Sequence, residues 1–214
     1  MSHSPSARDL DFGGAEHRLR GWLLFVLEGF GRYGLAPVAQ DRLHLLLYFA
    51  AVLSPVYRLE TPVLKILKHR TVPFYPEAQF ALERLVVSRH VINAGRESVR
   101  DDGSAWDAYR ISEAGLATAG LLATTAWGRR VSRFSHDLVQ GFARLDPEMA
   151  DAIVQQDAFF RDGRMDVDEV KTVTPGNEAV ATLRWVAEDE DESPHNERDS
   201  VLLYFTYLQA RMAA

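Results

Sequence analysis

The sequence predicts a mainly α-helical protein with a small β-wing, which is an α+β fold. Apolar residues recur at helical spacing along much of the chain. Two strand-like segments, residues 90–93 and 106–111, flank a charged tip with two glycines, residues 95–103. Over residues 40–125 the expected order is helix, short helix, longer helix, strand, loop, strand, helix. This is the order of a winged helix, so we expect a winged-helix module plus flanking helices.

The N-terminal part divides into a polar stretch and a helix. Residues 1–14 are rich in Ser and Gly, and we expect them to be disordered. Residues 15–32 carry apolar side chains at helical spacing, among them Leu19, Leu23 and Phe30. The middle of this helix is nearly apolar all round, which predicts burial on more than one side. It is either a core helix under the module or a helix offered to a partner subunit.

Each helix of the module has its own start signal. Asp41 can cap a helix over residues 42–52, because its carboxylate can accept from free N–H groups of the first turn. A Thr-Pro pair predicts a short basic helix over residues 62–68. A later proline opens an amphipathic helix over residues 77–90, in which we expect Phe80 to face inward.

The chain beyond the module is predicted to be a helical, acidic C-terminal region, residues 126–214, separate from the N-terminal helix and winged-helix-like domain of residues 15–125. An Asp-Pro-Glu signature predicts an amphipathic helix over residues 146–160. Residues 167–174 fit either a short strand or an extended loop. The last apolar segment, residues 201–212, fits either a helix or a strand.

Composition excludes several classes of function. The chain has 47% hydrophobic and 25% charged residues, as an ordinary globular protein does. It has no cysteine, which excludes disulfides, thiolate metal sites and a thiol nucleophile. Its polar N-terminus lacks the apolar centre of a signal peptide, and its apolar runs are shorter than the roughly 20 residues that span a bilayer. We therefore expect a cytoplasmic protein without a membrane partner.

Charge is distributed unevenly along the chain. Residues 1–145 hold 18 Lys/Arg and 14 Asp/Glu, a net charge of +4, whereas residues 146–199 hold 5 and 16, a net charge of −11. An acidic C-terminal third repels nucleic acid and suits a basic protein partner. A solvated acidic face without a partner would have the same pattern.

No catalytic motif is found. The sequence lacks a phosphate-binding loop, a dinucleotide-binding glycine pattern and a Gly-x-Ser-x-Gly elbow. Its seven histidines are scattered, without a His-Glu-x-x-His motif. We therefore expect no catalytic residue, no metal site and no cofactor, and a chain that is not an enzyme.

Two basic clusters are candidates for contact with DNA phosphate: Lys65, Lys68 and Arg70, and Arg129, Arg130 and Arg133. The predicted recognition helix, residues 76–90, has two Glu and two Arg and so no net charge, which argues against sequence-specific reading of DNA. Provided that the last segment is not core, four of its residues are candidates for contact with a partner: Val201, Tyr204, Phe205 and Leu208.

Several stretches together resemble a known family. They are the apolar run over residues 42–50, the Pro-Phe-Tyr-Pro segment at residues 73–76 that leads into the predicted helix, the strand-to-helix segment over residues 109–115, and the helical tail after Trp127. In element order and texture, residues 35–165 resemble the middle component of bacterial three-component ABC-ATPase defence systems, the Lamassu type.

The resemblance implies a small non-catalytic subunit of an antiviral complex, with no catalytic residue to carry over. Its partners would be an SMC-like ABC ATPase, which senses foreign DNA, and an effector, often a nuclease. We accordingly expect an accessory subunit that bridges the two and restrains the effector until foreign phage or plasmid DNA is sensed, with any DNA contact indirect. The alternative is a winged-helix DNA-binding transcriptional regulator that dimerises through its C-terminal helices.

Overall fold

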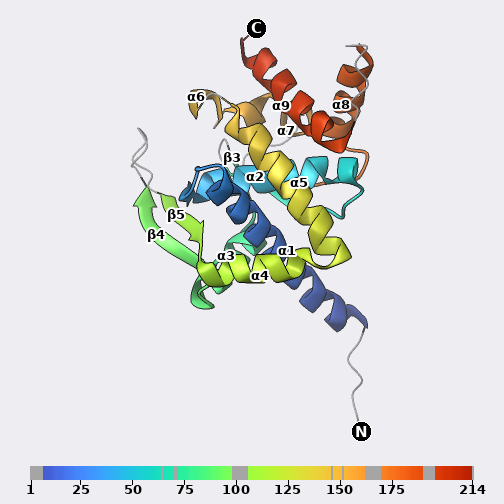
Figure 1. Ribbon diagram of the computed structural model, residues 1–214. Coiled ribbons are helices and arrows are strands. Elements are labelled where there is room, and N and C mark those ends of the chain that lie inside the picture. Colours follow the sequence, from blue (N-terminus) through green and yellow to red (C-terminus); the bar gives the residue numbers. More distant parts are fainter. Residues whose placement is uncertain are drawn as a thin grey trace.

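The fold is mainly α-helical with two small antiparallel sheets, so the predicted α+β class is confirmed. The computed structural model describes residues 7–63, 65–69, 72–97, 106–145, 147–150, 152–161, 170–189 and 196–213. Figure 1 shows helix α1 running through the middle of the molecule, with α4 and α5 crossing it and α8 and α9 at the end opposite the N-terminus. Among the helices of these described residues, none combines the length and apolar character needed to cross a bilayer.

Helix α1 (Ala7–Arg32) is a core element, which decides between the two roles that the sequence left open. Its middle is buried against α5 (Ala126–Ala143), where Trp22 meets Phe134 edge to face at 5.7 Å. Gly29 permits the close approach of α5, since a Cβ at this position would lie 2.9 Å from a methyl carbon of Val139. The helix begins at Ala7 instead of at the predicted residue 15. Residues 1–6 lie outside the described residues.

The first sheet joins β1 (Val38–Ala39), β5 (Trp106–Ile111) and β4 (Val91–Glu97) in that order, all antiparallel. The two predicted strands are therefore confirmed. The two-residue strand β1, which pairs with β5, was not predicted. Of the predicted tip, residues 95–97 belong to β4, and residues 98–103 lie outside the described residues.

Helix α2 (Gln40–Leu53) is buried along nearly its whole length and leads into the short helix η1 (Ser54–Tyr57). The predicted helix is confirmed, but it begins one residue before Asp41. Asp41 is therefore in the first turn instead of at the cap, and its carboxylate accepts from the N–H of Arg42 at 2.8 Å.

A second sheet replaces the predicted short basic helix over residues 62–68. Strand β2 (Lys65–His69) pairs with β3 (Val72–Phe74) on one side and with β6 (Val170–Thr172) on the other, both antiparallel. The helix prediction is wrong because a strand about a hundred residues later completes the backbone pairing of β2, and local start signals carry no information on such a partner. The sequence left residues 167–174 as either a strand or an extended loop, and residues 170–172 form strand β6.

The start of each of the two helices beside the first sheet is fixed by a local signal. Helix α3 (Pro76–Val87) begins at its proline, and α4 (Glu113–Ala123) is capped by Ser112, whose hydroxyl accepts from the N–H of Gly115 at 3.0 Å. The Ser112 hydroxyl also lies 2.7 Å from the carbonyl of Arg89, to which it can donate. This contact ties the start of α4 to the turn between α3 and β4.

The C-terminal region shares one core with the rest of the chain. Helix α8 (Glu178–Asp189) packs on α2, and α9 (Glu197–Ala213) packs on α5, so the predicted boundary at residue 125 does not separate two cores. The last apolar segment is thereby shown to be helical.

The single helix predicted for residues 146–160 is wrong. The chain forms three short pieces instead, α6 (Pro147–Ala150), η2 (Ile153–Gln156) and α7 (Ala158–Arg161). Asp157 has an extended backbone that interrupts the helix, and its carboxylate accepts from the N–H of Phe160 at 3.1 Å to cap α7.

Candidate functional site

A polar hollow lies on the outer side of α5, where this helix meets the end of α1 and the start of α9. Its volume is about 430 Å³ and it is open to solvent. Most of its charged and titratable residues are basic, and we call it the arginine hollow: Arg32, Arg129, Arg133, His136, Asp137 and Arg198. Three helices thus contribute guanidinium groups to one place.

The sequence pattern of α5 places the arginines. Val131, Phe134 and Leu138 recur at helical spacing and are buried in the core. Arg129 and Arg133, four residues apart, are therefore neighbours on the opposite, exposed face. The helix starts where the threonine before it accepts a hydrogen bond from the backbone, which fixes the register of this basic face.

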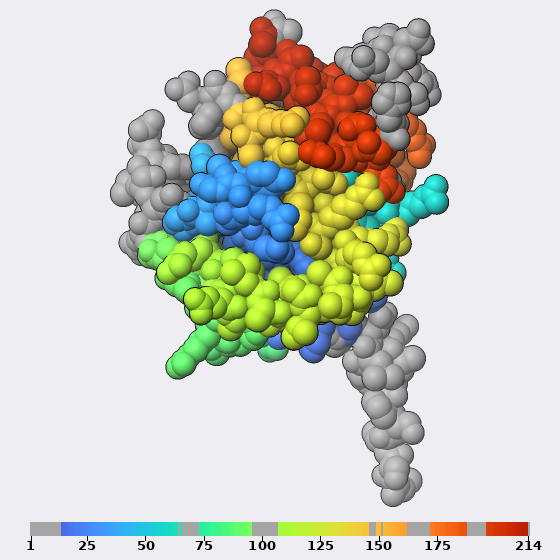
Figure 2. All heavy atoms as spheres, viewed as in Figure 1, coloured from blue at the N-terminus to red at the C-terminus, as the bar shows by residue number. Residues whose placement is uncertain are grey.

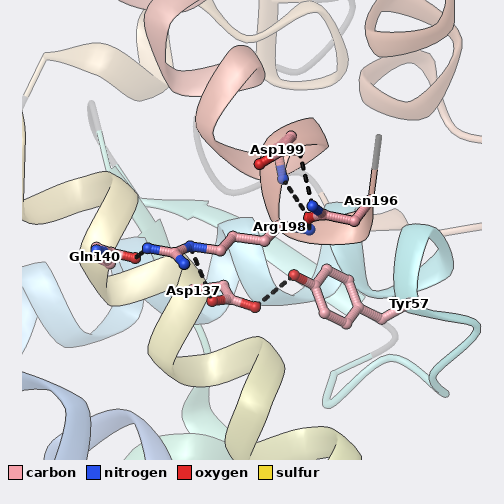
Figure 3. A network of polar contacts seen from close by, with 6 residues as sticks. All are labelled: Tyr57, Asp137, Gln140, Asn196, Arg198 and Asp199. Carbon is pink, nitrogen blue, oxygen red and sulfur yellow. Dashed lines mark hydrogen bonds and ion pairs between the residues drawn. The ribbon is translucent and has the colours of Figure 1, made fainter. Parts of the chain in front are cut away.

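A network of polar contacts holds the guanidinium of Arg198 at the edge of the hollow (Figure 3). The Tyr57 hydroxyl donates to Asp137 at 2.7 Å, and the other oxygen of this carboxylate lies 3.7 Å from Nε of Arg198. A terminal nitrogen of Arg198 also donates to the side-chain oxygen of Gln140 at 2.7 Å. Burial and the hydrogen bond to Asp137 raise the pKa of Tyr57 well above its usual range, so the phenol remains a donor.

A second carboxylate, that of Glu28 on α1, contacts two residues that line the hollow. Glu28 lies 3.7 Å from the guanidinium of Arg32 and 3.5 Å from Nε2 of His136. The contact with His136, followed by the charges of His136 and Arg32, lowers the pKa of Glu28 against the opposing effect of burial. At 3.5 Å the separation between Glu28 and Nε2 of His136 is at the outer limit of a hydrogen bond.

The three arginines predicted on α5 have different environments. Arg129 and Arg133 line the hollow, and Arg133 has no hydrogen-bond or ion-pair partner among the residues that the structure describes. Arg130 instead donates to the carbonyls of Tyr57 and Arg58, at 2.6 and 2.8 Å. Arg130 therefore holds the end of η1 against α5, and that structural role reduces its availability for phosphate.

Of the other predicted basic cluster, only Lys65 can be placed with its side chain, and it does not line the hollow. Lys65 is exposed on β2. Lys68 is in the same strand, but its side chain lies outside the described part of the chain, as does the whole of Arg70. Only the α5 cluster therefore belongs to a site with defined geometry.

The four candidates for partner contact in the last segment are core residues. Tyr204 and its neighbours on α9 are at most 2% exposed, which corrects their expected place in an interface: Val201, Tyr204, Phe205 and Leu208. Phe205 stacks edge to face on Phe49 of α2 with ring centroids 5.0 Å apart. The apolar side of α9 faces this chain's own α2 and α5, so these side chains stabilise the fold.

A buried carboxylate that sequence reasoning missed anchors the same helix. Asp157 is fully buried and accepts hydrogen bonds from the hydroxyls of Tyr48 and Tyr204. Burial raises the pKa of Asp157, although these hydrogen bonds oppose the effect. An aspartate before a Phe pair is a local capping signal, but the two tyrosines come from helices far away in the sequence. The cluster ties α2, α7 and α9 together.

Helix α4 has an unusual distribution of side chains, because two of its three leucines are exposed while its fully buried residues are small. Gly115 and Ala119 face the core, whereas Leu116 is 46% and Leu121 is 71% exposed. The remaining exposed residues on this side are small and uncharged apart from the first residue of the helix. Figure 2 shows α4 as a yellow-green band across the viewed surface. We call these exposed residues the α4 face: Ala114, Leu116, Ala117, Gly120 and Leu121.

Helix α3 also exposes apolar side chains. Phe80, expected to face inward, is 52% exposed, and Val87, two turns later, is 85% exposed. The prediction is wrong because α3 turns its other side, with Leu82 and Leu85, to the core. Arg84 lies over the Phe80 ring, 4.6 Å from its centroid, and pairs with a glutamate of α1. Exposed apolar side chains beside a paired arginine are more typical of a protein contact than of a helix that reads DNA bases.

Comparison with known proteins adds no family to these observations. The chain matches no protein-family model and no curated protein. Within the described residues, no three His, Asp or Glu side chains are grouped so that they could hold a metal ion.

Proposed function

We propose that α1, β1, α2, α3, β4 and β5 form a winged-helix module, with η1, β2 and β3 inserted between its second and third helices. The sheet order β1-β5-β4 supports this assignment, since the last strand of a winged helix lies between the other two. The position of α3 immediately before β4 also supports it. The module begins one helix earlier than the sequence suggested, because α1 and β1 take the first two places.

On this module we propose a non-catalytic accessory subunit that works through protein contacts. The observation that carries the proposal is the α4 face, where Leu116 and Leu121 are exposed on a helix whose charged and polar side chains are limited to Glu113 and the half-buried Thr118. Helices normally bury their leucines and expose their small or charged residues. A contiguous exposed apolar surface marks an interaction site more often than it marks free surface.

The partners that we propose follow from the family resemblance. They are an SMC-like ABC ATPase and an effector nuclease of an antiviral defence complex. The chain would bridge the two and restrain the effector until the ATPase senses foreign DNA. The exposed Phe80 and Val87 of α3 provide a second apolar surface, as a bridging subunit requires. The acidic charge of residues 146–199 favours a basic protein surface as one of the contacts.

Co-purification tests this proposal directly. The chain would be co-expressed with the proteins encoded beside it, as wild type, as the double variant Leu116→Gln/Leu121→Gln and as the control Trp185→Gln. Trp185 is 58% exposed on α8, so the control removes an equally exposed apolar group elsewhere. We expect the double variant to lose at least one partner at an unchanged melting temperature, while wild type and control keep both. Retention of every partner by the double variant, or no partner for wild type, would refute the proposal.

The alternative, a DNA-binding transcriptional regulator, is favoured by the arginine hollow alone. It predicts a complex with DNA upstream of its own gene that weakens steeply with salt. A gel shift at low salt without a complex would exclude it.

A further inference from the structure

We propose that the arginine hollow is a binding site for a phosphate ester, provided either by a nucleotide or by the backbone of DNA. The proposal is independent of the α4 face and of the accessory function. It rests on Arg32, Arg129, Arg133 and Arg198, which three helices bring to one open hollow that contains a single carboxylate, Asp137.

The first argument is that the one carboxylate is already engaged. Asp137 accepts from Tyr57 and lies beside Arg198, so its charge is offset by groups of the protein. Glu28, behind the hollow, in the same way offsets Arg32. Arg129 and Arg133 keep positive charge that no carboxylate in the described chain neutralises. An anion would therefore enter a site with two uncompensated guanidinium groups.

The second argument is that one of the donors is held in place. Arg198 contacts both Asp137 and Gln140, and these contacts restrict its long side chain before any ligand arrives (Figure 3). A guanidinium carries five N–H donors, so these two contacts leave others available. Pre-ordering reduces the entropy lost on binding, and it distinguishes this site from a row of freely moving surface arginines.

The third argument concerns the class of anion. Arginine binds phosphate with paired, charge-assisted hydrogen bonds, and a phosphate provides more acceptor oxygens than a carboxylate. A volume of about 430 Å³ lies within the range of small-molecule sites and exceeds what a single carboxylate fills. The open mouth also admits a phosphate that belongs to a longer chain. Phosphate esters fit the charge, the donors and the size together.

The experiment uses isothermal titration calorimetry on the full chain at low and at moderate salt. The probes are inorganic phosphate, ATP, a 20-base-pair duplex and a poly-glutamate peptide. The test variant is Arg133→Gln, with Arg129→Gln as a second one. The control is Arg110→Gln, an equal loss of charge at an exposed residue of β5, outside the hollow. Melting temperatures verify that each variant is folded.

We expect ATP or the duplex to bind, and Arg133→Gln to weaken binding at least tenfold, which is 1.4 kcal/mol, while Arg110→Gln changes it less than twofold. Binding of ATP but not of duplex would identify a nucleotide site, and the reverse would identify a backbone site. The proposal is overturned if neither binds, if poly-glutamate binds as tightly as the phosphate probes, or if Arg133→Gln and the control Arg110→Gln lose affinity equally.

Discussion

Acidification should destabilise this protein through one histidine, His44. Its ring is 2% exposed, between α2 and the entry to α3. The N–H of Tyr75 donates to Nδ1 at 3.2 Å, and Nε2 lies 3.5 Å from the side-chain oxygen of Gln79. Nδ1 is therefore the unprotonated nitrogen, and the buried imidazole is neutral.

Burial lowers the pKa of His44 from 6.5 to about 4. The unfolded chain therefore binds a proton more readily than the native protein between these values, and stability present above pH 6.5 is lost as the pH falls. One pKa unit corresponds to 1.36 kcal/mol, so the free energy of unfolding should fall by about 2 kcal/mol between pH 8 and pH 5 through this group alone.

Urea unfolding of wild type and His44→Asn at pH 8 and pH 5 measures this contribution. Asparagine can accept from the same backbone N–H but does not titrate. Asp157 has a raised pKa and acts with the opposite sign, but it is common to both proteins, so the comparison cancels its contribution. The variant should lose about 2 kcal/mol less than wild type, whereas a control at an exposed histidine of α1, His17→Asn, should follow wild type. Equal losses in wild type and His44→Asn would refute the reasoning.

Two further predictions concern stability. Tyr204→Phe removes one hydrogen bond to the buried carboxylate of Asp157 and should lower the free energy of unfolding by about 1.5–3 kcal/mol in urea titrations at neutral pH; no change would show that the bond is not formed. Gly115→Ala would place a Cβ 2.1 Å from the carbonyl oxygen of His90, which should cost about 3 kcal/mol. Its control, Gly120→Ala, meets nothing within 4 Å and should stabilise by about 0.5–1 kcal/mol.

Only the part of the candidate site on α5 could be predicted from the sequence. Arg129 and Arg133 are one helical turn apart, so spacing alone places them on one face of a helix. Arg32 and Arg198 are separated from them by about a hundred and by about sixty-five residues, and no local pattern connects them. Asp157 and Tyr48 are likewise 109 residues apart, and no local pattern connects them. Residues that meet across a fold are found only when the path of the chain is known.

The sequence by itself determined the helices α1, α2, α3 and α4 and the strands β4 and β5, because apolar periodicity and capping signals are local properties of the chain. Tertiary structure alone decided the rest. Strand β2 needed a distant strand to complete its backbone hydrogen bonds, and α9 needed other helices to bury it. The spacing of residues predicts which of them share a face of a helix or strand. Whether that face is buried depends on which other element packs against it, and spacing carries no information on that.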